Sequence, residues 1–346
     1  MRRHLNTIYV TSEDAWVRKD GANIVVEVDG VERGRAPIHM IGGLICFGRA
    51  GASPAVLAAC AESGVAVSLL TPNGKFIARV EGPRSGNVLL RRAQYRLADN
   101  PLQATAIVRG IVAAKAANQR TVLRRALRDH GAGMAAAARA ALEIAETRLT
   151  DIARRTLHGT EIAGLRGIEG EAAQVYFSVF DHLILVEDRS FAFAGRSRRP
   201  PLDRINALLS FLYAMLGHDC RSALESVGLD PQVGYLHADR PGRASLALDL
   251  MEEMRPVLAD RLALSLVNRR QLIAKDFIVE EGGAVLLTDA ARKELLVAYQ
   301  ERKKDELTHP FLGEKVTLGL VPHIQAQLLA RHLRGDIDGY PAFIWK

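Results

Sequence analysis

An abrupt change of pattern near residue 82 constrains the fold more than any other feature of this sequence. Before it, short segments rich in β-branched residues alternate with Asp20-Gly21 and Asp29-Gly30, dipeptides that favour the tight turn of a β-hairpin. After Glu81-Gly82-Pro83 the chain becomes rich in Ala, Leu and Arg, with apolar residues at helical spacing. Its 346 residues suffice for two domains. We therefore expect an α+β protein, with a small β-rich domain over 1–82 followed by a larger all-α domain over 83–346.

Local patterns predict where the individual elements lie. Strands are expected at 7–10, 15–18, 23–28, 31–38, 44–47, 65–70 and 76–80, and Ser53-Pro54 should open one helix among them. Helices are expected at 101–129, 133–157, 168–187, 203–217, 219–227, 245–268, 288–306 and 316–334, with a short hairpin between 274 and 287. The helices 101–129 and 133–157 should form an antiparallel pair.

Composition excludes several classes of protein. Apolar residues make up 48% and charged residues 25%, the balance of an ordinary globular protein. No uninterrupted apolar run of about 18 residues predicts a membrane-spanning helix, and no apolar stretch near the start predicts a secretory signal. The three cysteines, Cys46, Cys60 and Cys220, form no CxxC pair, which argues against a disulfide framework and a thiolate zinc site. We therefore expect a cytoplasmic protein with no membrane partner.

The positive charge is concentrated in one part of the chain. The formal net charge is +7, but residues 84–155 alone hold 14 basic and 5 acidic side chains. The segments on either side are close to balanced or slightly acidic. A localised basic zone is what binding to a nucleic-acid backbone requires. The alternative is a solvated helix face in an arginine-rich chain.

Common catalytic motifs are absent, since the sequence has no GxGxxG, P-loop, HExxH or GxSxG pattern. One unusual stretch is Arg166-Gly-Ile-Glu169-Gly-Glu171, in which Gly167 and Gly170 flank an acid at what we expect to be a helix start. Small neighbours would let a backbone or a phosphate approach the Glu169 carboxylate. The alternative is that the acids here only complement the helix dipole.

A second unusual stretch runs from 234 to 256. His237 should lie in a turn that leads into a helix capped by Ser245. On that helix Asp249 and Glu252 are three residues apart and share a face. Two adjacent carboxylates repel unless a cation lies between them. The alternative is a solvated face whose charge is balanced by neighbouring arginines.

Together, Glu169, His237 and Glu252, with Asp249 behind them, form a mixed carboxylate–imidazole set. Such a set suits Mn²⁺ or Mg²⁺ better than zinc, which prefers more nitrogen or sulfur donors. A divalent metal beside a phosphodiester polarises the phosphoryl oxygen and orients the attacking oxygen. The residues therefore predict metal-dependent chemistry on phosphodiesters.

Three blocks in this order make the sequence resemble the CRISPR-associated integrase family, the metal-dependent endonuclease of CRISPR spacer acquisition. They are GIEGEAAQVYF at 167–177, RPPLDRINALLSFLY at 199–213 and GYLHADRPGRASLALDLMEEMRP at 234–256. Each block is short, but the ordered set is specific, and the resemblance extends over nearly the whole chain. It implies an N-terminal β domain that dimerises and a larger helical catalytic domain.

The resemblance also implies roles for individual residues. The family's metal ligands fall on Glu169, His237 and Glu252. The last ligand is Asp in some relatives and Glu here, so Asp249 could share coordination or support it from a second layer. Asn206 and Tyr213 belong to the central block, where they serve either helix packing or the active site.

The partners implied by the resemblance are macromolecular. Two homodimers flank a dimer of a small ferredoxin-like partner, and the complex inserts short duplex DNA with 3′-hydroxyl ends into a CRISPR array, in antiviral immunity. The 3′-hydroxyl attacks a phosphodiester directly, and water in its place gives endonuclease activity. We expect phosphates to be held by Arg91, Arg92, Arg124, Arg125, Arg198, Arg199 and Arg243.

Two other functions fit part of this pattern. A non-catalytic nucleic-acid scaffold would use the basic zone and treat the acids as ordinary helix decoration. It would bind DNA with no dependence on metal or on Glu169. A hydrolase of small phosphoesters would explain the acids and His237, but not the charge of residues 84–155.

Overall fold

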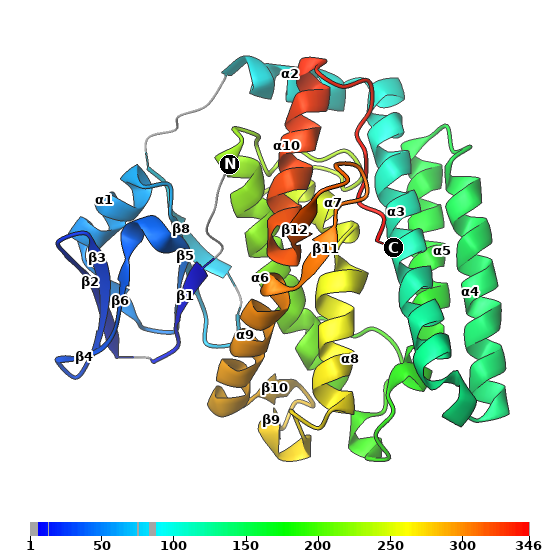
Figure 1. The fold of residues 1–346 in the computed structure, drawn as a ribbon, viewed down its shortest axis with the longest axis horizontal. Coiled ribbons are helices and arrows are strands. Elements are labelled where there is room, and N and C mark those ends of the chain that lie inside the picture. Colours follow the sequence, from blue (N-terminus) through cyan, green and yellow to red (C-terminus); the bar gives the residue numbers. More distant parts are fainter. Residues whose placement is uncertain (1–5, 13, 75, 83–87, 346) are drawn as a thin grey trace. The chain divides into compact units, whose positions relative to one another are not determined.

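The computed structural model describes residues 6–12, 14–74, 76–82 and 88–345, and Figure 1 shows its elements. The described residues form two compact units: one extends to residue 82 and includes Leu287–Lys304, and the other comprises 88–286 and 305–345. A β-rich N-terminal part is followed by a helical part, which confirms the predicted α+β class. Residues 83–87, where the expected boundary falls, lie outside the described residues. The domain limits 1–82 and 83–346 therefore stay a prediction.

The first unit contains two four-stranded sheets. Their strands are β1 Asn6–Val10, β2 Ala15–Asp20, β3 Asn23–Val28, β4 Val31–Pro37, β5 Ile41–Phe47, β6 Gly51–Ala52, β7 Ala66–Leu70 and β8 Phe76–Val80. One sheet has the order β1-β5-β7-β8, in which only β8 is antiparallel to its neighbour. The other has the order β4-β3-β2-β6, with β2 and β6 parallel. Every strand expected from the sequence is present.

Local chemistry explains these elements. Asp29 and Gly30 both have positive φ, at 53° and 73°, as the two-residue turn between β3 and β4 requires. Helix α1, Pro54–Glu62, begins as expected, with the Ser53 hydroxyl accepting a hydrogen bond from the Val56 amide. The helix packs against β2 and β7, so that Val56 lies in one apolar core with residues of both sheets.

Helix α9, Asp289–Lys304, groups with this first unit although it comes late in the chain. Its Arg292 Nη1 donates to Asn73 Oδ1 at 3.0 Å, and its Gln300 Nε2 donates to the carbonyl oxygen of Thr7 at 3.2 Å. This unit therefore differs from the expected first domain by one helix.

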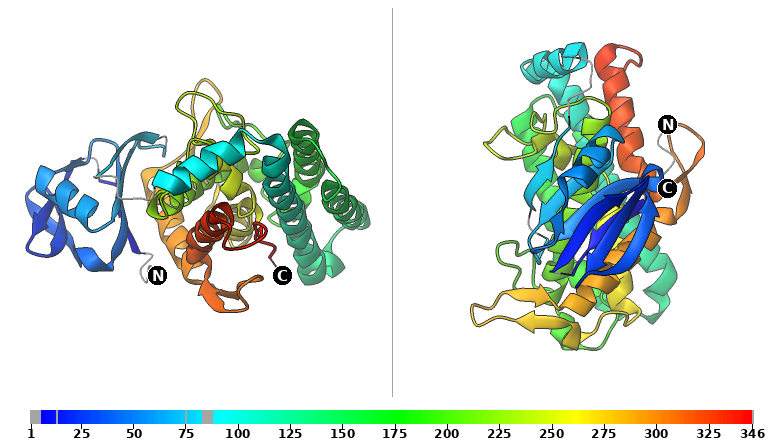
Figure 2. Two further views of the ribbon diagram at one scale, coloured as in Figure 1. Left: turned by 90° about the horizontal axis from the view of Figure 1, so that it is seen from above. Right: turned by 90° about the vertical axis from the view of Figure 1, so that its left-hand side faces the viewer.

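The second unit is built from helices. They are α2 Val88–Ala98, α3 Pro101–His130, α4 Ala136–Thr156, α5 Ile162–Ser178, α6 Arg204–Ser226, α7 Ser245–Glu252, α8 Arg261–Asn268 and α10 Val321–Arg334. Helices α3, α4 and α5 pack on one another, and Figure 2 shows them side by side, with α3 and α4 forming the predicted antiparallel pair. Two short hairpins pair β9 Phe277–Val279 with β10 Val285–Leu287, as predicted, and β11 Glu306–Thr308 with β12 Lys315–Thr317, which the sequence did not indicate.

Several helix boundaries differ from the predictions: the helix expected over 168–187 already ends at Ser178, and the one expected over 316–334 begins only at Val321. Helix α5 begins at Ile162, so Glu169 lies in its second turn and not at a helix start. The helices expected at 203–217 and 219–227 form one helix, α6, that continues through Gly217. A Cβ at Gly217 would make an ordinary van der Waals contact, 3.8 Å from the Met251 sulfur of α7, and the glycine does not end the helix.

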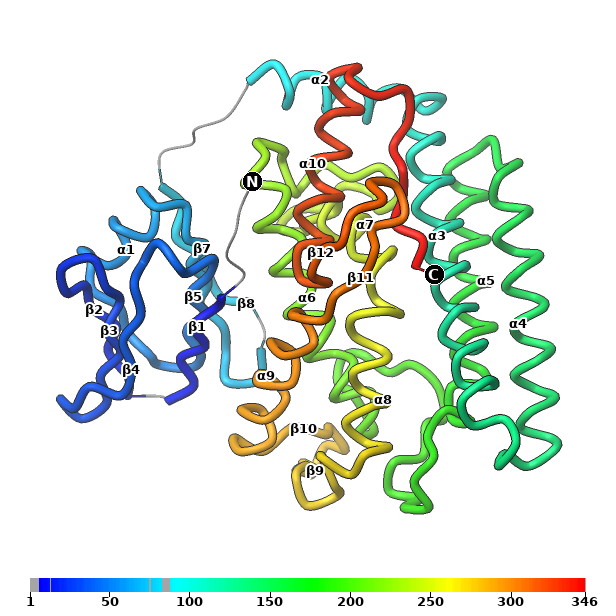
Figure 3. Tube along the Cα trace, in the orientation of Figure 1, coloured from blue at the N-terminus to red at the C-terminus, as the bar shows by residue number. Residues whose placement is uncertain are grey.

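The helix expected over 245–268 is interrupted. Helix α7 ends at Glu252, a π-helical turn covers Arg255–Asp260, and α8 then begins, as the trace in Figure 3 shows. Pro256 explains the interruption because it has no amide hydrogen to donate and disfavours helical geometry at the preceding residue. The interruption places Glu252 at a helix end. No helix within the described ranges is long and apolar enough to cross a membrane.

Candidate metal centre

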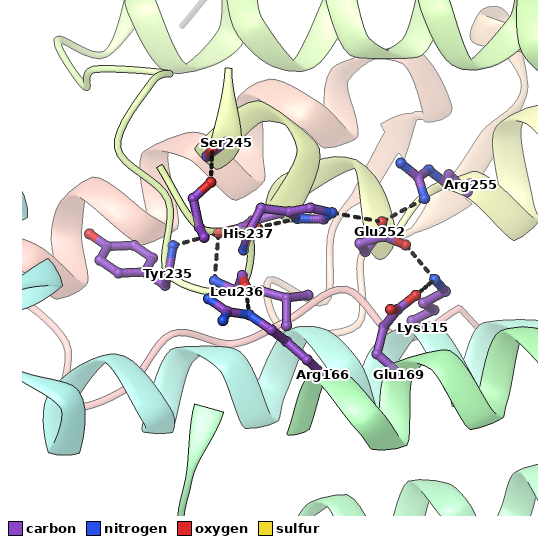
Figure 4. Close-up of polar contacts among 11 residues, drawn as sticks. Lys115, Arg166, Glu169, Tyr235, Leu236, His237, Ser245, Glu252 and Arg255 are labelled. Atoms are coloured by element: carbon purple, nitrogen blue, oxygen red, sulfur yellow. Dashed lines mark hydrogen bonds and ion pairs between the residues drawn. The ribbon is translucent and has the colours of Figure 1, made fainter. Parts of the chain in front are cut away.

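The two predicted acids converge on a lysine that sequence reasoning missed. Glu169 comes from α5, Glu252 from the end of α7, and Lys115 from the middle of α3 (Figure 4). The Lys115 ammonium contacts Oε1 of Glu169 and lies 2.6 Å from Oε2 of Glu252. The packing of α3 against α5 and α7 brings these side chains together. A lysine inside the apolar run of residues 111–117 was the available sequence signal.

Glu252 is held as a buried anion. Its side chain is 1% exposed, and Arg255 Nη1 lies 2.5 Å from its Oε1. Burial raises the pKa of Glu252, but the charges of Arg255, Lys115 and His237 outweigh burial and hold that pKa at about 2. Oε2 is paired with the Lys115 ammonium. Each oxygen of this buried carboxylate therefore faces a cation.

His237 is oriented by Asp249, whose carboxylate is fully buried. One oxygen accepts hydrogen bonds from the amides of Tyr235 and Leu236, and the other accepts from the His237 amide at 2.9 Å and ring Nδ1 at 2.7 Å. Because an ionised carboxylate only accepts, Nδ1 must carry a proton, and whenever the ring is neutral the lone pair of Nε2 is therefore available. Nε2 lies 3.8 Å from Oε1 of Glu252. Asp249 thus supports the imidazole, with both of its oxygens already used.

Close packing and hydrogen bonds from neighbouring residues fix the conformation of the loop that carries His237. A Cβ at Gly234 would lie 2.8 Å from the backbone of Ser245 and 2.9 Å from Oδ2 of Asp249, so only glycine fits. Ser245 Oγ donates to the Ala238 carbonyl at 3.1 Å, and Arg166 Nε of α5 donates to the Leu236 carbonyl (Figure 4). The spacing Gly234-x-x-His237 is therefore a requirement of the loop geometry.

Tyr213 lies behind the acids. Its hydroxyl donates to Asp260 Oδ1 at 2.7 Å, and the guanidinium of Arg255 lies 4.9 Å from its ring centre. Burial, and then the Asp260 charge, raise the pKa of Tyr213 well above its usual value, so the phenol stays protonated. Tyr213 therefore touches the arginine that pairs with Glu252, and Arg255 is a second site residue that the sequence prediction omitted.

Asn206 is fully buried and binds a different segment. Its amide donates to the Gly195 carbonyl at 2.8 Å, and its oxygen accepts from the Ser197 amide at 3.1 Å and from Arg196. These contacts anchor the chain before α6. An active-site role for Asn206 stays a prediction.

The donor set suits a hard divalent cation, but an ammonium lies among the donors. As the side chains are placed, no three His, Cys, Asp or Glu residues in the described part of the chain form a group that could hold a metal ion. Lys115 is the physical reason, because its ammonium lies between the two carboxylates. Mg²⁺ and Mn²⁺ accept carboxylate oxygens and the Nε2 of a neutral imidazole as ligands, and Glu169, Glu252 and His237 supply these groups. The residues fit such an ion once Lys115 moves away.

The arginines that we predict to bind phosphate differ in their solvent exposure and in their side-chain partners. Arg92, Arg124, Arg198 and Arg199 are exposed, while Arg91 and Arg243 are half-buried. Arg124 Nε lies 3.8 Å from Glu146 Oε1. Arg125 lies over the Trp345 ring, 3.8 Å from its centre, and so helps to hold the end of the chain. Binding of DNA by these arginines stays a prediction.

Comparison with known proteins places the chain in one family. The sequence model of the family described as "CRISPR associated protein Cas1" matches residues 8–301. The "CRISPR-associated endonuclease Cas1 2" of Rhodospirillum rubrum is 60% identical, with 100% of each chain covered. A Cas1 protein from Thermotoga maritima has the same fold, with a TM-score of 0.80, 23% identity and 95% and 97% of the two chains covered. A "casposase bound to integration product" gives a TM-score of 0.82 and 22% identity, over 99% and 95% of the two chains. The chain belongs to the family described as CRISPR associated protein Cas1.

Proposed function

We propose that this chain is a DNA endonuclease and integrase that depends on Mg²⁺ or Mn²⁺ and inserts short duplex DNA into a CRISPR array. The observation that carries the proposal is that Glu169 and Glu252, from separate helices, meet at one ammonium while Nε2 of His237 lies 3.8 Å from Oε1 of Glu252. Membership of the Cas1 family and the printed name of the R. rubrum relative, an endonuclease, support the reaction class. The name of the casposase complex, which mentions an integration product, supports strand joining.

Each residue of the site has a part in the proposed reaction. Glu169, Glu252 and His237 would hold the ion, which when bound stabilises charge on the phosphoryl oxygens of the target strand. Asp249 keeps the proton on Nδ1, so that Nε2 can act as a ligand. Arg255 keeps Glu252 ionised despite burial. The 3′-oxygen of the incoming strand loses its proton and forms a new bond to phosphorus, while the bond to the leaving 3′-oxygen breaks and that oxygen takes up a proton from water. The phosphorus is inverted and no covalent protein intermediate forms.

The macromolecular partners are part of the same proposal. Duplex DNA with 3′-hydroxyl ends and the array are the substrates, and a small ferredoxin-like protein is the partner of a Cas1 homodimer. Exposed arginines such as Arg92, Arg198 and Arg199 would contact phosphates without reading bases.

Strand joining tests the proposal. The full chain is mixed with its partner, a 3′-hydroxyl duplex and a supercoiled array plasmid, with Mn²⁺ or with a chelator. His237→Ala and Glu169→Gln should reduce joining at least about a hundredfold, since each removes a ligand. His158→Ala is a matched control, because His158 is an exposed histidine at the end of α4. Joining by Glu169→Gln at the wild-type rate would contradict the proposal.

One observation favours the alternative of a non-catalytic scaffold. Lys115 and Arg255 together already balance the charges of Glu169 and Glu252, so the site is electrostatically satisfied without a metal. A scaffold predicts DNA binding that is sensitive to salt but unchanged by a chelator. Strand joining by the wild type and by the His237→Ala and Glu169→Gln variants separates the two functions, because a scaffold would join no strands either as wild type or as a variant.

A further inference from the structure

Lys115 is buried, and its ammonium lies between acids from two other helices. The side chain is 6% exposed, and its neighbours in α3 from 111 to 117 are apolar and buried. Moving an unpaired ammonium into such surroundings would cost several kcal/mol, on the order of the penalty for any buried ion. Glu169 and Glu252 are therefore what keeps a charged lysine at this position.

The ammonium contacts oxygens through which the acids would also hold a metal. It touches Oε1 of Glu169 and Oε2 of Glu252, whereas Arg255 uses the other oxygen of Glu252. A divalent ion bound at about 2.1 Å from such oxygens would occupy space that the ammonium fills. Both groups are positive, so close approach is also repulsive. Binding of the ion would therefore compete with the Lys115 ion pairs.

Resting on the proposed function, we propose that Lys115 is a resident counter-cation that the divalent metal displaces, and that a DNA phosphate beside the metal receives the displaced ammonium. When the metal displaces Lys115 in the absence of DNA, the ammonium lies close to the divalent ion and has no anionic partner, because the metal now neutralises Glu169 and Glu252. A phosphodiester supplies the missing anion. Metal and DNA therefore strengthen each other's binding, and the factor is the same in both directions.

The test measures Mn²⁺ affinity from the paramagnetic resonance of the free ion, at one neutral pH, with and without a short duplex. The duplex has 3′-dideoxy ends, so that no strands are joined. For the wild type we expect weak binding without DNA and a gain of about tenfold with DNA. Lys115→Met should bind Mn²⁺ about tenfold more tightly without DNA, and the duplex should then add little. Arg109→Met is the matched control on the same helix, because Arg109 donates to the Leu157 carbonyl and not to an acid.

Glu169→Gln separates failure of this proposal from failure of the proposed function. If Glu169→Gln loses Mn²⁺ but Lys115→Met binds it no more tightly than the wild type, the metal site stands and displacement of Lys115 is wrong. If Glu169→Gln binds Mn²⁺ as the wild type does, the metal lies elsewhere and both proposals fail.

Thermal unfolding gives an independent measurement. Lys115→Met should melt at a lower temperature than the wild type without metal, since Glu169 and Oε2 of the buried Glu252 lose the ammonium. Mn²⁺ should restore more stability to the variant than to the wild type. A smaller Mn²⁺-induced rise in melting temperature in the variant would overturn the proposal. Lys115→Gln allows the same comparison if the methionine variant does not fold, because its amide can still donate to the acids.

Discussion

Replacing Asp249 by Asn tests whether the ring tautomer of His237 is set by its neighbour. The substitution keeps the size of the side chain but replaces one acceptor oxygen by a donor NH₂ group. If the amide oxygen keeps the bonds from the Tyr235 and Leu236 amides, the NH₂ group faces the His237 amide and ring Nδ1. The ring can then accept at Nδ1 only by moving its proton to Nε2. A protonated Nε2 cannot bind a metal.

The size of the effect follows from the bonds that are lost. Two of the hydrogen bonds to the Asp249 carboxylate, those from the His237 amide and ring, lose their acceptor. Each hydrogen bond to a charged group contributes about 1.5–3 kcal/mol, so the free energy of unfolding should fall by about 3–6 kcal/mol. Loss of a group that orients a ligand typically weakens metal binding by about 10–100-fold. Strand joining should fall by at least the same factor when Mn²⁺ is limiting.

Three measurements check this chain of reasoning: urea unfolding, Mn²⁺ affinity, and the ¹⁵N chemical shifts of the His237 ring, which report the tautomer. Asp230→Asn is the matched control, since Asp230 lies in the same loop and accepts from the Tyr95 hydroxyl and the Gln232 amide. The tautomer argument is refuted if Asp249→Asn is destabilised yet binds Mn²⁺ with wild-type affinity.

Three further predictions concern other parts of the second unit. Burial raises the pKa of Asp260 from 3.8 to about 6. The protonated carboxyl therefore stabilises the fold fully below about pH 4, and this stabilisation is lost as the pH rises through 6. In urea unfolding at a series of pH values, Asp260→Asn should remove about 3 kcal/mol of the change in unfolding free energy. Gly234→Ala should both lower the melting temperature and weaken Mn²⁺ binding, because its Cβ would lie 2.8 Å from Ser245 and would shift the His237 loop. Unchanged Mn²⁺ binding would show that this close contact does not position His237. Replacing the exposed Arg198 and Arg199 by Ala should make the slope of log K against log salt less negative by about 1–2 for duplex DNA, whereas an unchanged slope would exclude them as phosphate contacts.

Elements with strong local signals could be predicted from the sequence. The hairpin dipeptides, the Ser53-Pro54 helix start and the helical spacing after residue 100 each act within a few residues of their own position, and these elements are present. The interruption after Glu252 also had a local cause, Pro256, but the helical spacing on both sides concealed it. The predicted start of helix α5 was wrong, because the spacing of apolar residues does not mark the residue at which a helix begins.

The proximity of His237, Asp249 and Glu252 could be predicted because the three residues lie within one loop and the helix that follows. Their role as a metal site stays a prediction. Lys115 and Arg166 could not be identified in this way. Lys115 pairs with acids far away in the sequence, and Arg166 fastens a backbone carbonyl of the His237 loop. Such contacts depend on how helices pack, which local patterns do not encode.

The relative placement of Lys115 and Glu252 depends on the end of the chain. Glu253, the neighbour of Glu252, is buried and accepts from the Phe343 amide at 2.6 Å. Asn118, one turn after Lys115, donates to the backbone carbonyls of Glu253 at 2.7 Å and Phe343 at 2.9 Å. A single buried amide thus joins α3, the end of α7 and the C-terminal segment. Because an unpaired buried polar group is costly, these bonds leave little freedom for the two helices to shift. The spacing of α3 and the end of α7, from which Lys115 and Glu252 project, is therefore held by residues that touch neither side chain.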